Sequence, residues 1–271
     1  MDEALLTRIA EALERLAPPA PQPADLRAFP AYGWDGEELC AIPSIDPVEY
    51  ELLVGIDAQK QALLDNSHRH AAGHAAHDVL LWGARGTGKS AAVAAVVTRL
   101  QREGSALALV QCAVADLGAM PRLMALLGTV DRPFILFLDD LGFDDQTGDA
   151  RALRSLLQGG AAARPNNVRL YVTSNRRHIV PRYLSEQDDP INVRDVVDDR
   201  MALSDRFGLS LGFHAIDQAT YVAIVGAHAG ALGLAFDPVE AIGWATQRGG
   251  RSGRVARQYV VELAGRAGLA G

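Results

Sequence analysis

The chain has 271 residues, of which 49% are apolar and 22% charged, enough for one large domain or two modest ones. Its net charge of −7 argues against a protein that coats DNA through a generally basic surface. Cys40 and Cys112 form no close-spaced pattern, and neither a signal peptide nor a membrane-spanning run is apparent. We therefore expect a cytoplasmic protein with no membrane partner.

The first 40 residues differ in character from the rest of the chain. Apolar residues recur at near-helical spacing over residues 3–17, which predicts an amphipathic helix. The proline-rich "APPAPQPAD" (17–25) then ends the helix and indicates a stiff linker. The aromatic and glycine-rich "AYGWDG" (31–36) is interpreted as a loop. We assign residues 1–40 to an N-terminal helix and linker, in which the helix docks on its own domain or on a partner.

Short apolar runs alternate with helical patterns from residue 41 to residue 215. The expected strands are 78–83, 106–112, 134–139, 168–174 and 209–213, and the expected helices between them are 88–103, 116–128 and 148–163. Strands that alternate with helices are typical of an α/β fold, in which helices flank both faces of a parallel sheet. We expect residues 41–215 to form such a core.

No strand pattern continues beyond residue 215. Residues 216–271 instead predict three helices, with Asp217, Asp237 and Ser252 as the side chains that cap their N-termini. Glycines close the first two of these segments. The sequence therefore predicts a small C-terminal helical domain.

"GARGTGKS" (83–90) matches the P-loop pattern G-x-x-x-x-G-K-[ST] between an expected strand and an expected helix. Its glycines let backbone N–H groups approach a phosphate, and the helix N-terminus adds a partial positive charge. Lys89 would reach the β- and γ-phosphates, and the Ser90 hydroxyl would bind Mg²⁺. The residues expected to bind the nucleotide are Gly83, Ala84, Arg85, Gly86, Thr87, Gly88, Lys89, Ser90 and Ala91.

The apolar "FILFL" (134–138) leads into two carboxylates, Asp139 and Asp140. Unpaired buried carboxylates are costly, so a positive partner is expected beside them. We expect this third strand to lie beside the P-loop strand, where Asp139 would hold Mg²⁺ with Ser90. Asp140 would orient and deprotonate the attacking water, or would cap the following turn. Glu is more usual for this base, and Asp has a shorter reach.

These motifs continue with "YVTSN" ending at Asn175, "LSDRFG" (203–208) and "GRSGRVARQ" (250–258). In this order they resemble the motifs of AAA+ ATPases. Over about residues 40–265 the sequence is more closely similar to a bacterial AAA+ family catalogued mainly as a domain of unknown function. The resemblance implies a P-loop NTPase core with a helical lid that binds and hydrolyses ATP with Mg²⁺. It also implies a homo-oligomeric ring or arc, for which a hexamer is one size.

The resemblance also implies individual roles for several residues. Asn175 corresponds to sensor 1, which places water near the γ-phosphate, with capping of its own turn as the alternative. Arg206 corresponds to an arginine finger that reaches the nucleotide of a neighbouring subunit, with pairing to Asp205 as the alternative. Arg254 corresponds to sensor 2, with Arg251 as the second choice. The segment expected to contact adenine is Val54, Gly55 and Ile56.

Three functions remain open from the sequence. The first is an ATPase that remodels or loads an unidentified macromolecular partner. The second is an ATP-dependent binding module with little hydrolysis, which the Asp at position 140 and the absence of an aromatic residue in "QCAVADLGAM" (111–120) favour. The third is a nucleic-acid-associated loader or initiator that uses the arginines of 248–257, although the sequence shows no appended DNA-reading module.

Two further segments carry expectations. In "HRHAAGHAAH" (68–77), His70, His74 and His77 could share one helical face and bind a metal, but a solvated segment is the favoured interpretation. The charged segment 176–200 is long for a connection between strands. We expect it to change its order when ATP binds.

Overall fold

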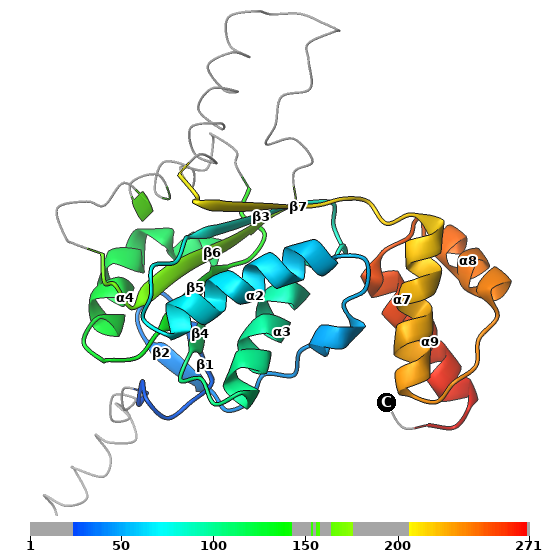
Figure 1. Cartoon of the computed structure of the whole chain (residues 1–271), viewed down its shortest axis with the longest axis horizontal. Helices are drawn as coiled ribbons and strands as arrows, with labels where there is room; N and C mark the ends of the chain where they lie inside the picture. Colours follow the sequence, from blue (N-terminus) through cyan, green and yellow to red (C-terminus); the bar gives the residue numbers. More distant parts are fainter. Residues whose placement is uncertain (1–23, 143–152, 154–155, 158–163, 176–205, 270–271) are drawn as a thin grey trace, which may run out of the picture.

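The computed structural model describes residues 24–142, 153, 156–157, 164–175 and 206–269 (Figure 1). The expected helix at 3–17, the segment 176–200 and most of the expected helix at 148–163 lie outside these residues. No helix within the described ranges is long and apolar enough to cross a membrane.

A seven-stranded sheet forms the core, with the strand order β2-β1-β4-β5-β6-β3-β7. The strands are β1 (Ala31–Trp34), β2 (Leu39–Ile42), β3 (Val79–Gly83), β4 (Ala108–Cys112), β5 (Phe134–Leu138), β6 (Val168–Ser174) and β7 (Leu209–Phe213). All neighbouring strands are parallel except β1 and β2, which pair antiparallel. The five strands expected from the sequence are confirmed, and two more precede them.

The two additional strands correct the expected start of the core. The sheet begins at Ala31 rather than at residue 41, so the interpretation as a loop is wrong for residues 31–34, whereas residues 35 and 36 lie in the turn that follows β1. β1 is only four residues long and largely buried, so it shows no alternation of apolar and polar residues that would mark a strand. Tyr32 at its centre is fully buried, and its hydroxyl donates a hydrogen bond of 2.6 Å to the Asp25 carbonyl.

Helices cover both faces of the sheet. The helical segments of the core are η1 (Tyr50–Leu52), α2 (Asp57–Ala71), α3 (Lys89–Arg102), η2 (Val114–Ala119) and α4 (Met120–Leu127). α2 and α3 pack on one face, whereas η2 and α4 pack on the other (Figure 1). All five residues of β5 are buried because this central strand is covered on both sides.

The strand order also corrects the expected neighbour of the P-loop strand. β3 pairs with β6 and β7, and β6 separates it from β5. The expectation that the strand ending at Asp139 lies beside the P-loop strand is therefore wrong. The local sequence pattern of a strand does not encode its place in the sheet. Both strands still end at the same edge, because they run parallel.

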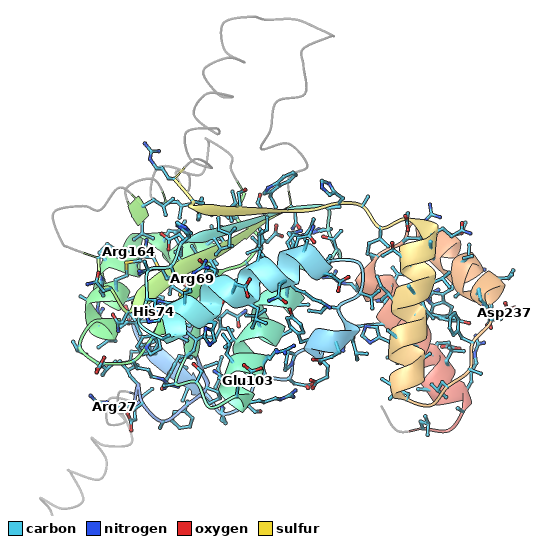
Figure 2. The ribbon with its side chains drawn as sticks, in the orientation of Figure 1. Arg27, Arg69, His74, Glu103, Arg164 and Asp237 are labelled. Carbon is cyan, nitrogen blue, oxygen red and sulfur yellow. The ribbon has the colours of Figure 1, made fainter. Side chains whose placement is uncertain are left out.

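Three helices form the C-terminal lid, as expected. They are α7 (Gln218–Ala231), α8 (Pro238–Gln247) and α9 (Gly253–Arg266). The three predicted N-caps are confirmed, because Asp217, Asp237 and Ser252 accept hydrogen bonds from the backbone N–H groups of Thr220, Val239 and Val255. Figure 2 labels Asp237 on the lid, away from the sheet. Tyr221 and Tyr259 are fully buried in the lid's own core.

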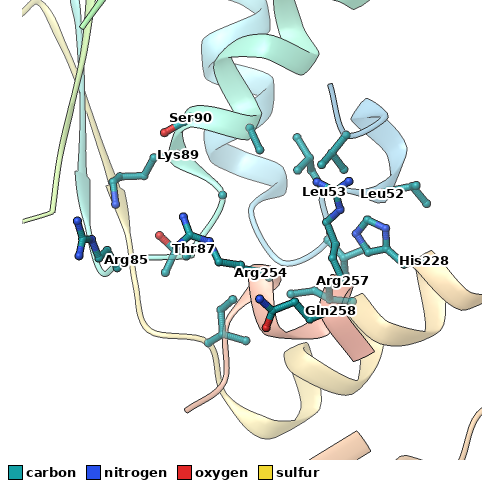
Figure 3. A pocket seen from close by; sticks show the side chains of 18 of the residues that line it. Leu52, Leu53, Arg85, Thr87, Lys89, Ser90, His228, Arg254, Arg257 and Gln258 are labelled. Atoms are coloured by element: carbon teal, nitrogen blue, oxygen red, sulfur yellow. The ribbon is translucent and has the colours of Figure 1, made fainter. Parts of the chain in front are cut away.

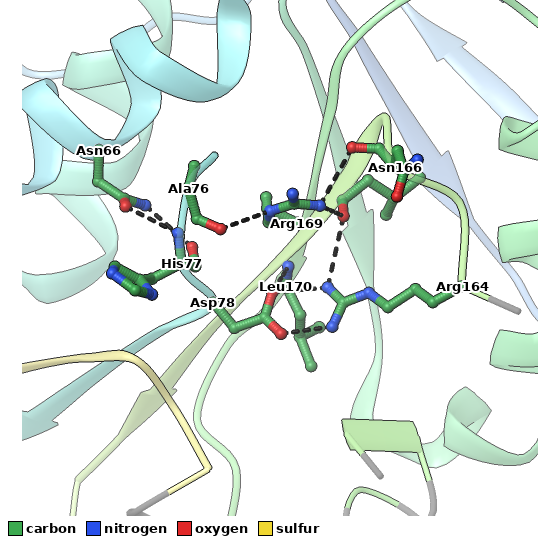
Figure 4. Close-up of polar contacts among 9 residues, drawn as sticks. Asn66, Ala76, His77, Asp78, Arg164, Asn166, Arg169 and Leu170 are labelled. Carbon is green, nitrogen blue, oxygen red and sulfur yellow. Dashed lines mark hydrogen bonds and ion pairs between the residues drawn. The ribbon is translucent and has the colours of Figure 1, made fainter. Parts of the chain in front are cut away.

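A polar cluster fixes the amino ends of β3 and β6, at the edge opposite to the P-loop (Figure 4). Asp78 forms an ion pair with Arg164 and accepts a hydrogen bond of 2.8 Å from the Leu170 backbone N–H. Asn66 exchanges two hydrogen bonds of 2.9 Å with the backbone of His77. These contacts hold α2 to the sheet and satisfy buried polar groups.

The histidine-rich segment contains no shared histidine face. α2 ends at Ala71, so His74 and His77 lie beyond the helix that carries His70. His70 is 2% exposed, and its Nε2 lies 3.0 Å from the Phe134 carbonyl oxygen. No group of three or more potential metal-binding side chains occurs among the residues that the structure describes. His70 therefore has a structural role in the core.

Stability should fall with acid because of His70. Burial lowers its pKa to about 4, so the unfolded chain binds the proton between about pH 6.5 and about pH 4 while the folded chain does not. This histidine should therefore remove about 2 kcal/mol of stability between about pH 7 and about pH 4.5. Urea unfolding at both pH values measures the change. A His70→Gln variant, which keeps a donor for the Phe134 carbonyl, should lose this part of the pH dependence; an unchanged dependence would contradict the assignment.

Candidate functional site

A cavity of about 1190 Å³ lies between the carboxyl edge of the sheet and the lid. The P-loop lines one side of it, η1 and the following loop line a second, and α7 and α9 line a third (Figure 3). Ligand pockets in proteins typically measure roughly 300–1,000 Å³. The space is therefore sufficient for a nucleotide.

The P-loop adopts a backbone that glycine alone tolerates at key points. Gly83 has a φ of 134°, and a Cβ there would lie 1.9 Å from the Phe213 carbonyl oxygen. Gly88 has a φ of 98° and leads directly into α3. Within the described part of the chain, no backbone acceptor is found for the N–H groups of Gly86 and of residues 88–91. These groups form an anion site at a helix N-terminus, which suits a phosphate.

Lys89 is held at the base of this anion site. Its side chain is 5% exposed. Its Nζ donates hydrogen bonds to the carbonyls of Gly83 at 3.0 Å and Ala84 at 2.8 Å, and to Asn175 Oδ1 at 2.9 Å. Burial lowers the pKa of the ammonium, and the carboxylates of Asp139 and Asp140 oppose that effect. The arrangement fixes a positive charge where the phosphates of a nucleotide would lie.

Ser90 and Asp139 meet as expected, although their strands are not adjacent. The Ser90 hydroxyl donates a hydrogen bond of 2.6 Å to Asp139 Oδ1. A hydroxyl and a carboxylate are ligands that suit Mg²⁺ bound together with phosphates. The donor set therefore fits the expected metal.

Thr173 was missed by the sequence reasoning. It is 1% exposed, and its hydroxyl donates a hydrogen bond of 2.5 Å to Asp139 Oδ1. The Thr173 hydroxyl oxygen itself accepts a hydrogen bond of 2.8 Å from the Asp140 backbone N–H. A polar residue within an otherwise apolar buried strand needs a partner, and this was the available signal. Thr173 positions both carboxylates from β6.

Asp140 has a left-handed backbone with a φ of 58°, the only non-glycine residue with positive φ in the described chain. Asp and Asn tolerate this conformation better than longer side chains such as Glu. The backbone thus gives a physical reason for Asp where Glu is more usual. Asp140 Oδ2 lies 3.0 Å from the Arg85 guanidinium, and Oδ1 accepts a hydrogen bond from Asn175 Nδ2. The turn that this carboxylate would cap continues into residues 143–145, which lie outside the described residues.

Asn175 connects the P-loop to the carboxylate edge. It lies directly after β6, between the ends of β3 and β5. Its amide oxygen accepts from Lys89, and its amide nitrogen donates to Asp140. The residues expected to act in catalysis are Lys89, Asp140, Asn175 and Arg206, and the structure brings the first three together.

The lid contributes arginines to the opposite wall. Arg254 lines the cavity and points from α9 toward Thr87 (Figure 3). Arg251 does not line it, and its guanidinium donates a hydrogen bond of 3.3 Å to Gln218. The geometry favours Arg254 over Arg251 as the arginine that reaches a bound phosphate.

The apolar end of the cavity is formed largely by the expected segment. Val54 and Ile56 line it with Leu53, whereas Gly55 has a φ of 81° and packs against Thr220 outside the lining. His228 and Arg257 of the lid also line this end (Figure 3). Burial, with a smaller contribution from Arg257, lowers the pKa of His228. No motif in the sequence identified His228, and Arg257 belongs to the 250–258 segment without a role expected for it at the nucleotide.

Arg206 is not part of the cavity in its own chain. It lies three residues before β7, which runs parallel to β3. Arg206 is therefore at the amino edge of the sheet, whereas the P-loop is at the carboxyl edge. The structure separates it from the other three residues expected to be catalytic.

The parallel sheet, the P-loop and the helical lid define an AAA+ P-loop ATPase fold. A variant of RuvB from Thermotoga maritima matches with a TM-score of 0.52 and 15% identity, over 82% of this chain and 67% of that one. Residues 27–267 match the model of the family described as "Protein of unknown function (DUF815)", and the chain belongs to this family. A comparison with curated proteins found no match.

Two structures from Aeropyrum pernix show the same fold. Aeropyrum pernix ORC1, solved in complex with DNA, matches with a TM-score of 0.54 and 17% identity, over 81% of this chain and 65% of that one. Aeropyrum pernix ORC2, described as ADPNP-ADP complexes, matches with a TM-score of 0.53 and 16% identity, over 84% of this chain and 67% of that one. This chain thus spans about two thirds of these structures.

Proposed function

We propose that this protein binds ATP with Mg²⁺ in the cavity between core and lid and hydrolyses it. The observation that carries the proposal is the convergence of a phosphate-binding loop, a hydroxyl–carboxylate pair and a second carboxylate at one sheet edge. The ORC2 structure with a similar fold contains nucleotides, which supports the same use of this site.

Each residue of the site has a part in this function. The backbone N–H groups of the P-loop and Lys89 bind the phosphates. Ser90 and Asp139 hold Mg²⁺, which when bound neutralises charge on the phosphate oxygens. Asp140 accepts a proton from water that Asn175 orients.

The walls of the cavity complete the nucleotide site. Arg254 binds a phosphate oxygen from the lid, since its side chain points toward the P-loop. Val54 and Ile56 pack against the base at the apolar end. ATP thereby contacts the core and the lid together.

We further propose that hydrolysis requires a ring or arc of identical subunits. Arg206 is remote from the cavity of its own chain, so only a neighbouring subunit can bring it to a nucleotide. Stabilisation of the transferred phosphoryl group by an arginine in trans would then couple turnover to assembly. Turnover would remodel or load a macromolecular partner.

A binding module with little hydrolysis is the second candidate. In the structure both oxygens of the Asp140 carboxylate accept hydrogen bonds, one from Arg85 and one from Asn175. In this state the carboxylate is not available to accept a proton from water. A protein in which this state persists would bind ATP and recruit a partner without turnover.

A role with nucleic acid is supported less well. The ORC1 structure was solved with DNA. However, Arg254 and Arg257 line the cavity and Arg248 stacks on the Trp244 ring at 3.3 Å, so the arginines of 248–257 do not form one strip directed at a nucleic acid.

Calorimetry with Mg²⁺ and a non-hydrolysable ATP analogue tests the nucleotide site. We expect Lys89→Ala to weaken binding about 10- to 100-fold, because charge-assisted hydrogen bonds contribute roughly 1.5–3 kcal/mol. Arg102→Ala is the matched control. Arg102 is an exposed cation at the far end of α3, the helix that begins at Lys89, and it forms an ion pair with Glu49. The absence of binding by the wild-type protein would overturn the proposed function.

A further inference from the structure

Arg85 makes an unusual contact for a residue of the phosphate-binding loop. Its side chain is 77% exposed, and its Nη2 lies 3.0 Å from Asp140 Oδ2. The two residues come from the ends of β3 and β5, so the ion pair spans the end of β6 that lies between them. Asn175, which follows β6, donates to the other oxygen of the same carboxylate.

This ion pair is exposed and therefore contributes little to the stability of the fold. Ion pairs between exposed side chains are weak, because solvent screens them and side-chain entropy is lost. Asp140 meanwhile adopts a left-handed backbone, which is a strained conformation for a residue with a side chain. Strain at a site together with a weak, exchangeable partner is typical of a functional contact.

A terminal phosphate would compete with Asp140 for Arg85. Asn175 is bonded to both Lys89 and Asp140, so these groups surround the same end of the cavity as Arg85. A guanidinium forms bidentate hydrogen bonds with phosphate, and the terminal phosphate of ATP carries more charge than one carboxylate. ADP lacks that phosphate and offers no such competition.

We propose that Arg85 discriminates ATP from ADP by exchanging Asp140 for the terminal phosphate. This inference rests on the proposed function. Without a terminal phosphate, the guanidinium engages Asp140. With ATP bound, Arg85 contacts the terminal phosphate and releases the carboxylate of Asp140.

The released carboxylate then completes the reaction. The oxygen of a water molecule forms a bond to the terminal phosphorus, and the proton of that water moves to Asp140. The bond from the terminal phosphorus to the bridging oxygen breaks, and its electron pair remains on the β-phosphate. Asp140 then gives this proton to an oxygen of the departing phosphate, and once the phosphate leaves, Arg85 returns to the ionised carboxylate of Asp140.

Binding of two nucleotides to variants of Arg85 tests the proposal. Calorimetry with Mg²⁺ compares ADP with a non-hydrolysable ATP analogue for the wild type, Arg85→Gln and Arg85→Lys. We expect Arg85→Gln to lose affinity for the triphosphate by about 10-fold, or about 1.4 kcal/mol, with affinity for ADP nearly unchanged. Arg85→Lys should retain most of the preference because it keeps the charge. Arg102→Gln, in an exposed pair with Glu49, should change neither affinity.

The outcomes separate the two proposals. If Arg85→Gln loses affinity for both nucleotides equally, or loses affinity for neither, the role of Arg85 is overturned. The proposed nucleotide site would still stand. A wild-type protein that binds neither nucleotide would overturn the proposed function and this inference together. Thermal unfolding of each variant checks the fold. The midpoint should match that of the wild type, because the replaced side chains are exposed.

Discussion

An Asp140→Asn variant is expected to bind Mg-ATP and to hydrolyse it about 100- to 10,000-fold more slowly than the wild type, the range typical for loss of a general base. The amide keeps the shape of the side chain but cannot accept a proton. Asn also tolerates the left-handed backbone that position 140 requires, so the fold should persist. Steady-state phosphate release and calorimetry measure the two effects separately.

Asp65→Asn is the matched control for this experiment, because Asp65 is an exposed carboxylate on α2 whose partner is Gln61. It should leave turnover unchanged. Turnover of Asp140→Asn within a few-fold of the wild type would show that Asp140 is not the base. A wild type that binds ATP without turnover would instead favour the binding module.

An Arg206→Ala variant is expected to lose about 1,000-fold or more in turnover, as for other arginines that stabilise a transferred phosphoryl group. Its affinity for nucleotide should stay close to that of the wild type, because Arg206 does not line the cavity of its own chain. Turnover per subunit in the wild type should rise with protein concentration as assembly proceeds. Phosphate release over a concentration series, with light scattering on the same samples, measures both.

A mixing experiment decides whether Arg206 acts between subunits. Lys89→Ala supplies an intact Arg206 but has a defective nucleotide site, whereas Arg206→Ala has the reverse defect. Neither variant alone should turn over, and an equimolar mixture should recover part of the wild-type rate. If mixed assemblies form but turnover does not recover, Arg206 does not act between subunits. Full turnover by assembled Arg206→Ala would also contradict this role.

The sequence predicted those parts of the fold whose signals are local. The P-loop follows from eight consecutive residues, and the lid helices follow from caps such as Asp217 and Ser252. β1 was missed because a short, largely buried strand carries no alternation. The position of β6 between β3 and β5 depends on pairing between distant segments, which no local pattern records.

The candidate site divides in the same way. Lys89, Ser90, Asp139 and Asn175 were found because each belongs to a motif or ends an apolar strand. The contact of the Arg85 side chain with Asp140 could not be anticipated from the sequence. Arg85 follows β3 and Asp140 follows β5, and the two strands are separated in the sheet by β6. His228 and Arg257 reach the cavity only through the way in which the lid packs on the core.

A backbone hydrogen bond joins the lid to the P-loop. Gly253, the first residue of α9, donates a hydrogen bond of 2.8 Å to the Gly86 carbonyl, and a Cβ on Gly86 would lie 2.8 Å from the Ser252 Cβ. The turn that receives the phosphates and the start of α9 are therefore joined directly. We expect a nucleotide that shifts the Gly86 carbonyl to change the tilt of α9 as well, with the largest displacement at the end of the lid farthest from this bond.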